Sequence, residues 1–578
     1  MLRSGGSAWG ARLLAAALLI GPVAASAQAV NRFGVPIPMR DGVRLVANLW
    51  IPAGTGRFPA ILLRTPYDKT AQFGRYRLVN YLKAGYAVVV QDTRGRGDSE
   101  GGFDFYFPEG RDGFDTIEWI AAQPWSNGRV GTDGGSYLGT VQWLAARERP
   151  PHLACMIPTA SSGRLFDEIP YQGGAFRLEW ALPWLNETSG RVSQGDLNGL
   201  VHWDSLAVQR PLVRLDSLMG RPMPLYQRFL AHDTRDWYWK RIHFTDRDFA
   251  AIGVPTLTFT GWFDGDQPGA LSYWDGMSRR PGGAGDNFLV IGPWSHAQTY
   301  LGGALTMGAF RFDSAAIIKT QDLRIKFFDW CLKQSSPRFD EPRVRAFVMG
   351  SNRWVEGDRY PLSGTESRSY YLRSRGRANT LDGDGTLSID PPGDDPPDHF
   401  DYDPKRPVPS SDPATDQREI ERRPDVLVFT TPVLEAGVDV LGRVFVELQI
   451  ASDATDTDFT AKLIDVGQDG QAVLLGPVAT GVIRARYRNG PERTELLVPG
   501  KPTPVQIELF DVGHTFLPGH RIRVDISSSA FPYVDANPNT GRTIATETTT
   551  QVARQTVFHD RVRPSRLVLP MIAGGGRR

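Results

Sequence analysis

A serine in a glycine-rich turn is the strongest chemical signal in the sequence. Ser136 lies within residues 131–140, which read GTDGGSYLGT, between a predicted strand and a predicted helix. The helix is indicated by apolar residues at helical spacing, namely Leu138, Val141, Leu144 and Ala145. Glycines beside a serine accept a strained backbone and leave room for a reacting carbonyl group. The second glycine of the usual Gly-x-Ser-x-Gly pattern comes one residue late, at Gly139, so the turn indicates a nucleophile only if the chain also supplies a base and an acid.

The base should be a histidine that follows a later strand. A serine hydroxyl needs a neighbouring base to take its proton, and a carboxylate orients that base. In sheet-based hydrolases these residues follow in the order Ser, Asp, His. Of the nine histidines, His296 alone follows directly on a buried-strand run after the serine, at residues 287–291. The others precede a strand or fall in the predicted helical and β-rich regions: His152, His202, His232, His243, His399, His514, His520 and His559.

The acid should follow the strand before this histidine. Residues 254–260 form that strand, and Asp264 and Asp266 come after it. Asp264 is nearer the strand end and is the preferred triad acid, which leaves Asp266 free for another role.

A tetrahedral intermediate also needs hydrogen-bond donors for its oxyanion. One donor should be the backbone N–H of Tyr137, the residue after the nucleophile. The second should come from the loop after the strand at residues 60–64. The expected glycine-rich loop is missing there, and the Tyr67 hydroxyl is the available side-chain donor.

Alternating strands and helices predict the framework that positions these residues. After a hairpin at residues 35–51, short apolar runs alternate with amphipathic helices, which implies a parallel sheet with helices on both faces. The predicted buried strands are 60–64, 86–91, 153–158, 254–260 and 287–291, and the predicted helices are 76–84, 113–122 and 320–332.

Two regions depart from this alternation. Residues 164–245 read as aromatic, helix-like segments and predict a cap over the site, whose aromatic side chains, Trp180 among them, either line a substrate pocket or pack the cap onto the body. Beyond Pro342 alternating strands such as 444–450 and 521–526 predict a β-sandwich, with an irregular loop at 381–416. The expected fold is therefore α/β, an α/β-hydrolase fold with a helical cap insertion and a C-terminal β-sandwich.

The N-terminus and the composition limit location and partners. Residues 1–27 have two arginines, an apolar run and a small-x-small ending, which is typical of a cleaved signal peptide and predicts a periplasmic or secreted protein. No later segment is long and apolar enough to predict a membrane span. The net charge is +1, which argues against a nucleic-acid-binding surface. Cys155 and Cys331 are the only cysteines, and the sequence leaves a bridge or two buried thiols open.

Five ordered motifs resemble one known family. They are RTPY at 64–67, QDTRGRGDSEG at 91–101, GGSYLG at 134–139, GWFD at 261–264 and GPWSH at 292–296. Together they resemble the cocaine esterase and α-amino acid ester hydrolase family of serine hydrolases, related to X-prolyl dipeptidyl peptidases. The resemblance implies a triad of Ser136, Asp264 and His296, an oxyanion hole of Tyr67 and Tyr137, and a C-terminal jelly-roll.

The resemblance also implies a substrate-binding cluster of carboxylates. In α-amino acid ester hydrolases this cluster binds the substrate ammonium group and includes the residues two and three positions after the triad acid. Here those positions hold Asp266 and Gln267, so one acid is kept and one is lost. A third acid would come from the start of the cap, where Asp167 and Glu168 stand. Either of them can be the third member of the cluster, or both can be ordinary surface acids.

These observations predict an exported serine hydrolase that cleaves small ester or amide substrates through an acyl-enzyme. The expected domains are the α/β-hydrolase domain at 28–163 and 246–340, the cap at 164–245 and the jelly-roll at 341–578. No cofactor and no metal are expected, and the sequence leaves a homo-oligomer open. Two alternatives remain, an exopeptidase that releases X-Pro dipeptides and an inert hydrolase body that carries a glycan-binding jelly-roll.

Overall fold

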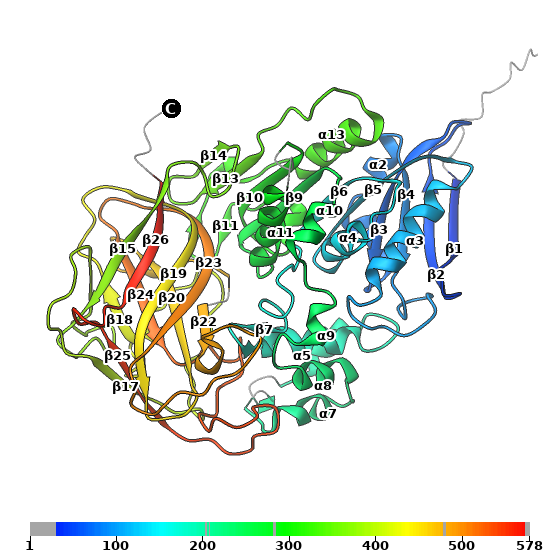
Figure 1. Ribbon diagram of the computed structural model, residues 1–578. Coiled ribbons are helices and arrows are strands. Elements are labelled where there is room, and N and C mark those ends of the chain that lie inside the picture. The colour runs from blue at the N-terminus through cyan, green and yellow to red at the C-terminus, as the bar shows by residue number, and fades with distance from the viewer. Residues whose placement is uncertain (1–29, 203–204, 207, 281–284, 478–480, 573–578) are drawn as a thin grey trace, which may run out of the picture.

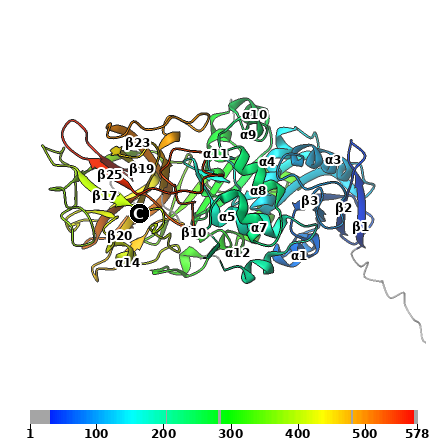
Figure 2. The same ribbon diagram turned by 90° about the horizontal axis from the view of Figure 1, so that it is seen from below.

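The computed structural model describes residues 30–202, 205–206, 208–280, 285–477 and 481–572. The predicted signal peptide, residues 1–27, lies outside this part of the chain. The described chain forms an α/β body, a cap of short helices and a C-terminal β domain, which lie around a common centre (Figure 1). Seen from below, the β domain and the α/β body occupy opposite ends of the molecule, with cap helices between them (Figure 2).

The α/β body is built on a ten-stranded sheet with a parallel centre. The strand order is β1-β2-β4-β3-β5-β6-β9-β10-β13-β14. Neighbours from β4 to β13 run parallel, whereas β1, β2 and β14 pair antiparallel at the two edges. The strands are β1 (Val30–Pro38), β2 (Arg44–Ile51), β3 (Phe58–Thr65), β4 (Ala87–Asp92), β5 (Ser126–Gly135), β6 (Leu153–Thr159), β9 (Thr256–Phe263), β10 (Asn287–Ser295), β13 (Val344–Val348) and β14 (Arg353–Gly357). The last two continue the sheet past the predicted domain boundary at 340.

Helices cover this sheet because its central strands are apolar on both faces. The helices of the body are α1 (Lys69–Arg75), α2 (Val79–Lys83), α3 (Glu109–Ala121), α4 (Tyr137–Arg147), α10 (Asp246–Ala251), α11 (Gln267–Arg279), α12 (Gln298–Leu301) and α13 (Thr320–Lys333). The single helix predicted at 76–84 is wrong in its start. Helix α1 ends before Tyr76, and Arg77 adopts a left-handed φ of 49°, which breaks the helical path before α2 begins.

The cap connects β6 to α10 and consists mainly of short helices. Its elements are a two-residue hairpin, β7 (Tyr171–Gln172) and β8 (Ala175–Phe176), the helices α5 (Leu178–Thr188), α7 (Leu215–Leu218), α8 (Pro224–Ala231) and α9 (Trp237–Lys240), and the 3-10 turns η1 (Gly195–Leu200) and η2 (Leu212–Arg214). Helices α5 and α8 pack together, and buried Phe229 and Tyr226 join the same apolar core as the body.

The β domain follows β14 and contains a twelve-stranded sheet. Its strands are β15 (Thr365–Arg373), β16 (Thr386–Ser388), β17 (Asp398–Tyr402), β18 (Leu427–Thr430), β19 (Val438–Ser452), β20 (Asp458–Val466), β21 (Ala472–Leu474), β22 (Gly481–Arg484), β23 (Thr503–Phe516), β24 (Arg521–Ser527), β25 (Ala553–Phe558) and β26 (Arg566–Ile572). The irregular loop predicted at 381–416 is wrong in part, because β16 and β17 lie inside it. Strand β17 pairs with β25 and buries Phe400 and Tyr402 on one face.

The domains share apolar packing and are tied together by specific bonds. One buried cluster joins Trp262 and Ile291 of the body to the interior of the β domain. The Gln267 side chain of α11 donates to the Asp511 carbonyl oxygen of β23 at 2.9 Å, and Arg164 of the cap forms an ion pair with Glu508 of β23. Within the body, a Cys155–Cys331 disulfide links β6 to α13, which resolves the alternatives that the sequence left open.

Candidate active site

Ser136 lies on a sharp turn between β5 and α4. Its φ of 59° and ψ of −129° are unusual for a non-glycine residue, and such strain persists only where the surroundings fix it. Its N–H lies 2.9 Å from the Thr159 carbonyl oxygen and 3.0 Å from that of Ala160. The turn is therefore held against the end of β6.

The glycines of this turn allow close packing on both sides. A Cβ atom on Gly135 would lie 1.9 Å from the Tyr300 ring. A Cβ on Gly139 would lie 2.8 Å from both the Thr159 carbonyl oxygen and the Ser161 Cβ. The late glycine of the motif is therefore the residue that lets the first turn of α4 approach the loop after β6.

Asp264 and His296 follow the parallel neighbours β9 and β10 and meet at the carboxyl ends of these strands. The His296 Nδ1 lies 2.7 Å from Asp264 Oδ1. The Asp264 carboxylate is fully buried and also accepts from the Thr260 hydroxyl at 2.9 Å and the Asp266 N–H at 3.0 Å. A carboxylate fixed in this way holds the imidazole in one orientation.

The charge around His296 favours its protonated form. Burial alone would lower the pKa of His296, but the Asp264 charge and hydrogen bond, with further charge from Asp266 and Glu168, raise that pKa to about 9. Asp266 Oδ2 lies 3.8 Å from His296 Nδ1, so it is a second, more distant anion beside the imidazole.

Tyr300 is a site residue that the sequence reasoning missed. Its hydroxyl lies 3.1 Å from His296 Nε2, and its ring stands edge-on to the imidazole at 5.7 Å. Among the described residues, Tyr300 rather than Ser136 is the hydrogen-bond partner of Nε2. Its position four residues after His296 was the available signal, because residues at this spacing share one side of a helical turn.

The two predicted oxyanion donors lie beside the serine. Tyr67 lines the same cavity as Ser136, and its hydroxyl oxygen accepts from the Trp184 indole N–H at 3.0 Å. Because an indole only donates, the Tyr67 proton remains available for another acceptor. Burial, against hydrogen bonding by Trp184 and Ser136, raises the pKa of Tyr67 to about 12, so the hydroxyl stays protonated near neutral pH. Tyr137 begins α4, where main-chain N–H groups point out of the helix.

A cavity of about 600 Å³ is lined by the proposed catalytic side chains Ser136 and His296 and by Tyr67. Besides Ser136, Tyr67 and His296, its walls include Asp266 and the predicted substrate contact Trp180. Trp180 stacks on Trp184 at 5.3 Å, so α5 supplies an aromatic wall to the cavity that Ser136 lines. A flat apolar wall of this kind suits an aromatic or aliphatic substrate group.

The predicted carboxylates occupy three different environments. Asp266 faces the cavity, and burial together with the Asp264 charge raises its pKa to about 6. Glu168 is buried and accepts from the N–H groups of Gly163, Arg164 and Gly269 at 2.9, 3.0 and 3.2 Å. Burial and the nearby Asp266 charge raise the pKa of Glu168 well above its ordinary value. Asp167 pairs with Arg235 at 2.8 Å and does not line this cavity.

Gln267, which replaces the second acid of the family cluster, has a structural role. Its side chain donates to the Asp511 carbonyl oxygen at 2.9 Å and accepts from the Asp511 N–H at 2.8 Å. The amide therefore binds both main-chain groups of one residue of β23. It is fully buried and ties α11 to the β domain.

Comparisons with known proteins agree with this architecture. Residues 41–298 match the X-Pro dipeptidyl-peptidase (S15 family) profile, and residues 337–568 match the X-Pro dipeptidyl-peptidase C-terminal non-catalytic domain. Cocaine esterase of Rhodococcus sp. (strain MB1 Bresler) is 36% identical over 574 residues, which cover 93% of this chain and 98% of the esterase. The chain therefore belongs to the cocaine esterase and α-amino acid ester hydrolase family of serine hydrolases.

Solved structures of the family share the whole fold. An aminopeptidase from a marine sediment Thaumarchaeota archaeon has a TM-score of 0.84 at 27% identity, covering 96% of this chain and 98% of its own. An α-amino acid ester hydrolase has a TM-score of 0.82 at 27% identity, covering 96% and 100%. The predicted fold class and family are thereby confirmed for this hydrolase, and the inert-body alternative is not supported.

Within the described ranges, no group of three or more His, Cys, Asp and Glu side chains is arranged to hold a metal ion. No helix in the part of the chain that the structure describes is long and apolar enough to cross a membrane.

Proposed function

We propose that this hydrolase cleaves esters or amides of small acyl groups through a Ser136, His296 and Asp264 triad. The carrying observation is the 2.7 Å contact between His296 and Asp264, at strand ends that open on the same cavity as the strained Ser136. Ser136 Oγ attacks the substrate carbonyl carbon while His296 Nε2 takes its proton. The Tyr300 hydroxyl is hydrogen-bonded to this nitrogen, so this hydrogen bond has to break before Nε2 can take the proton of Ser136.

The remaining steps use the same residues. The Tyr67 hydroxyl and the Tyr137 N–H stabilise the oxyanion of the tetrahedral intermediate. His296 then gives its proton to the leaving alcohol or amine, the carbonyl bond reforms, and an acyl-Ser136 ester remains. His296 takes a proton from water, whose oxygen attacks the ester carbonyl carbon. The bond to Ser136 Oγ then breaks, His296 returns the proton to this oxygen, and the acid is released with the free serine restored. Neither a metal nor a cofactor takes part in the proposed steps.

Labelling by a fluorophosphonate probe tests the nucleophile directly, because only an activated serine reacts. Wild type should label and hydrolyse p-nitrophenyl acetate. Ser136→Ala should fold, fail to label and lose about 10⁴-fold or more in kcat. Retention of more than a tenth of the wild-type kcat would remove Ser136 from the mechanism.

We further propose a preference for acyl groups with a free α-amino group, through Asp266. Its carboxylate is 13% exposed on the cavity wall, and a partly desolvated ion pair contributes more than an exposed one. Gln267 is turned to the β domain, so Asp266 is the carboxylate that meets the substrate ammonium group, and Glu168 lies farther away. The kcat/KM for acyl groups with a free α-amino group should therefore be roughly ten- to thirty-fold higher than for those without one.

Phenylglycine methyl ester and phenylacetic acid methyl ester give the comparison, measured at pH 7. Asp266→Asn should abolish the preference, whereas Asp167→Asn, whose carboxylate pairs with Arg235 outside the cavity, should keep it. Equal wild-type kcat/KM for the two esters would contradict ammonium recognition and favour a simple carboxylesterase.

An X-Pro dipeptidyl-peptidase activity is the second candidate function. The matched S15 profile and Asp266, whose carboxylate lines the site cavity where a peptide N-terminus would lie, favour it. An Ala-Pro anilide separates the two activities. Turnover of the anilide with kcat/KM above that of phenylglycine methyl ester would favour the exopeptidase.

We also propose export through the signal peptide at 1–27, with no nucleic-acid or membrane partner for the mature chain. The Cys155–Cys331 disulfide supports an oxidising compartment. N-terminal sequencing of protein from the periplasm or medium should begin at Gln28. Recovery of the full-length chain in the cytoplasm alone would contradict export.

A further inference from the structure

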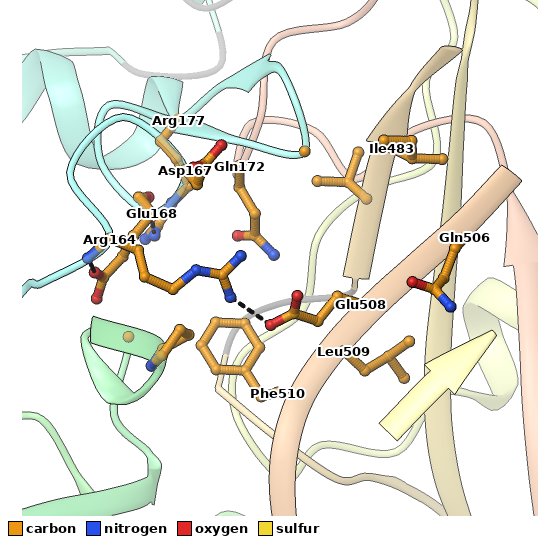
Figure 3. Close-up of a pocket in the computed structure, with 14 residues that line it drawn as sticks. Arg164, Asp167, Glu168, Gln172, Arg177, Ile483, Gln506, Glu508, Leu509 and Phe510 are labelled. Carbon is orange, nitrogen blue, oxygen red and sulfur yellow. Dashed lines mark hydrogen bonds and ion pairs between the residues drawn. The ribbon is translucent and has the colours of Figure 1, made fainter. Parts of the chain in front are cut away.

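A second cavity adjoins the cavity of the proposed active site. It has a volume of about 170 Å³ and is enclosed by the start of the cap, the loop before α11 and strands β22 and β23. Figure 3 shows Asp167, Glu168 and Arg177 on its cap side, and Ile483, Gln506 and Leu509 on its β-domain side. A cavity of roughly 150 Å³ can hold benzene, so this one has room for a short chain and a small polar head group.

Most charges on the walls of this cavity are already paired. Arg164 forms an ion pair with Glu508, drawn as the dashed line in Figure 3. Asp167 pairs with Arg235 at 2.8 Å. Both oxygens of Glu168 accept main-chain N–H groups. The acidic side chains of the walls are therefore committed to donors of the protein.

Arg177 differs from these residues. Its side chain is 8% exposed, and it lines both cavities together with Gly265, so these two residues form the partition between them. Its guanidinium makes one hydrogen bond within the described residues, at 3.3 Å to the Glu168 carbonyl oxygen, and no ion pair with a carboxylate there. The charged group lies 4.3 Å from the Tyr533 ring centre, and its Nε has no partner.

A buried guanidinium with spare donors calls for an acceptor. Leaving a buried charged donor unpaired is costly, and Arg presents a planar fork that matches a carboxylate. The aromatic contact with Tyr533 stabilises the positive charge without using the N–H groups. An anion with two oxygens would satisfy these spare donors.

We propose that Arg177 and the second cavity form a subsite for a carboxylate carried by the acyl group, distal to the scissile carbonyl. This inference rests on the proposed function, because Ser136 must be the nucleophile for the acyl side to face Asp266 and Arg177. Substrates would be half-esters of short dicarboxylic acids, with or without the α-amino group that Asp266 binds. Arg177 is thus a specificity residue and takes no part in bond breaking.

Methyl half-esters of the dicarboxylic acids from succinate to suberate test the subsite, each compared with its uncharged ω-amide. At one or more chain lengths the wild-type kcat/KM should be roughly tenfold or more higher for the carboxylate than for the amide. Arg177→Gln should bring this ratio near one, and Arg177→Lys should keep part of it. Arg228→Gln is the matched control, because Arg228 is a cap arginine that pairs with Asp104 and lines neither cavity.

Inhibition gives a readout that needs no variant. Free adipate or glutarate should inhibit wild-type hydrolysis of p-nitrophenyl acetate more strongly than the matching diamide. Equal kcat/KM for half-esters and ω-amides at every length, or an equal loss for both in Arg177→Gln, would overturn the inference. If p-nitrophenyl acetate itself is not hydrolysed by wild type, the proposed function fails first.

Discussion

Single side chains decide the proposed chemistry, and Tyr67 is the clearest case. The Trp184 indole N–H occupies a lone pair of the Tyr67 oxygen at 3.0 Å, which directs the phenolic proton elsewhere. Tyr67→Phe should therefore lower kcat by roughly 10² to 10³ with little change in KM, as expected for a donor that acts mainly in the transition state. Steady-state kinetics with p-nitrophenyl acetate measure this effect.

Tyr226→Phe is the matched control for the loss of a buried hydroxyl. The Tyr226 hydroxyl donates to the Leu212 carbonyl oxygen at 2.7 Å inside the cap and lines neither cavity. It should lower stability and leave kcat unchanged. An unchanged kcat in Tyr67→Phe, with chemistry shown to be rate-limiting, would place the oxyanion donor elsewhere.

The pH dependence of kcat/KM follows from the charges around His296. Only the neutral imidazole can accept the serine proton. Burial would lower the pKa of His296, but Asp264 and Asp266 raise it to about 9, so most molecules are protonated at pH 7. For a neutral ester, kcat/KM should rise with pH up to about 9. Asp266→Asn removes one neighbouring anion and should move this acid limb to lower pH.

Asp167→Asn serves as the control for that experiment, because Asp167 pairs with Arg235 and lies outside the site cavity. Its pH profile should match wild type. Suppose that the acid limb of wild type lies near the ordinary histidine pKa of about 6.5 and that Asp266→Asn does not move it. This result would contradict the conclusion that Asp266 raises the pKa of His296.

At the scale of elements, the contact between α4 and β6 holds the nucleophile turn. A Cβ at Gly139 would lie 2.8 Å from the Thr159 carbonyl oxygen, so Gly139→Ala forces α4 away from β6. We expect a loss of about 1–3 kcal/mol in the free energy of unfolding, together with a lower kcat because α4 carries the Tyr137 N–H. Urea denaturation and p-nitrophenyl acetate kinetics measure the two effects.

Gly74→Ala is the control, since Gly74 lies in α1 and its added Cβ would meet no atom within 4 Å apart from its chain neighbours and the backbone of its own helix. It should be neutral or stabilise by about 0.4–1 kcal/mol. Similar unfolding free energies for the two variants would show that the α4 contact tolerates a methyl group.

The sequence predicted these elements well where a local pattern carried the information. Apolar runs located β3, β4, β6, β9 and β10, and the order of strand ends brought Asp264 and His296 together. The prediction of one helix at 76–84 was wrong in its start because spacing does not report a single left-handed residue, Arg77. The role of Arg177 depends on which surfaces of the cap and the β domain meet in three dimensions, and no local pattern carries that information.

At the scale of the whole molecule, the β domain supports the loop of the proposed active site through Gln267. This residue follows Asp266 directly and binds both main-chain groups of Asp511 on β23. The second domain therefore fixes the loop that carries Asp264 and Asp266. The β domain also supplies Glu508 and Phe510 to the walls of the second cavity. The shape of this cavity therefore depends on how the β domain packs against the cap and the body.

Gln267→Glu tests this connection, because it restores the acid that the family cluster has at this position. A glutamate cannot donate to the Asp511 carbonyl oxygen and would bury a charge close to Asp264 and Asp266. We expect a loss of about 1–3 kcal/mol or more in unfolding free energy and no gain in the preference for phenylglycine methyl ester. Chemical denaturation and the ester comparison measure the two quantities. A stronger ammonium preference at unchanged stability would instead mean that position 267 turns to the cavity, and that the loop is held without the β domain.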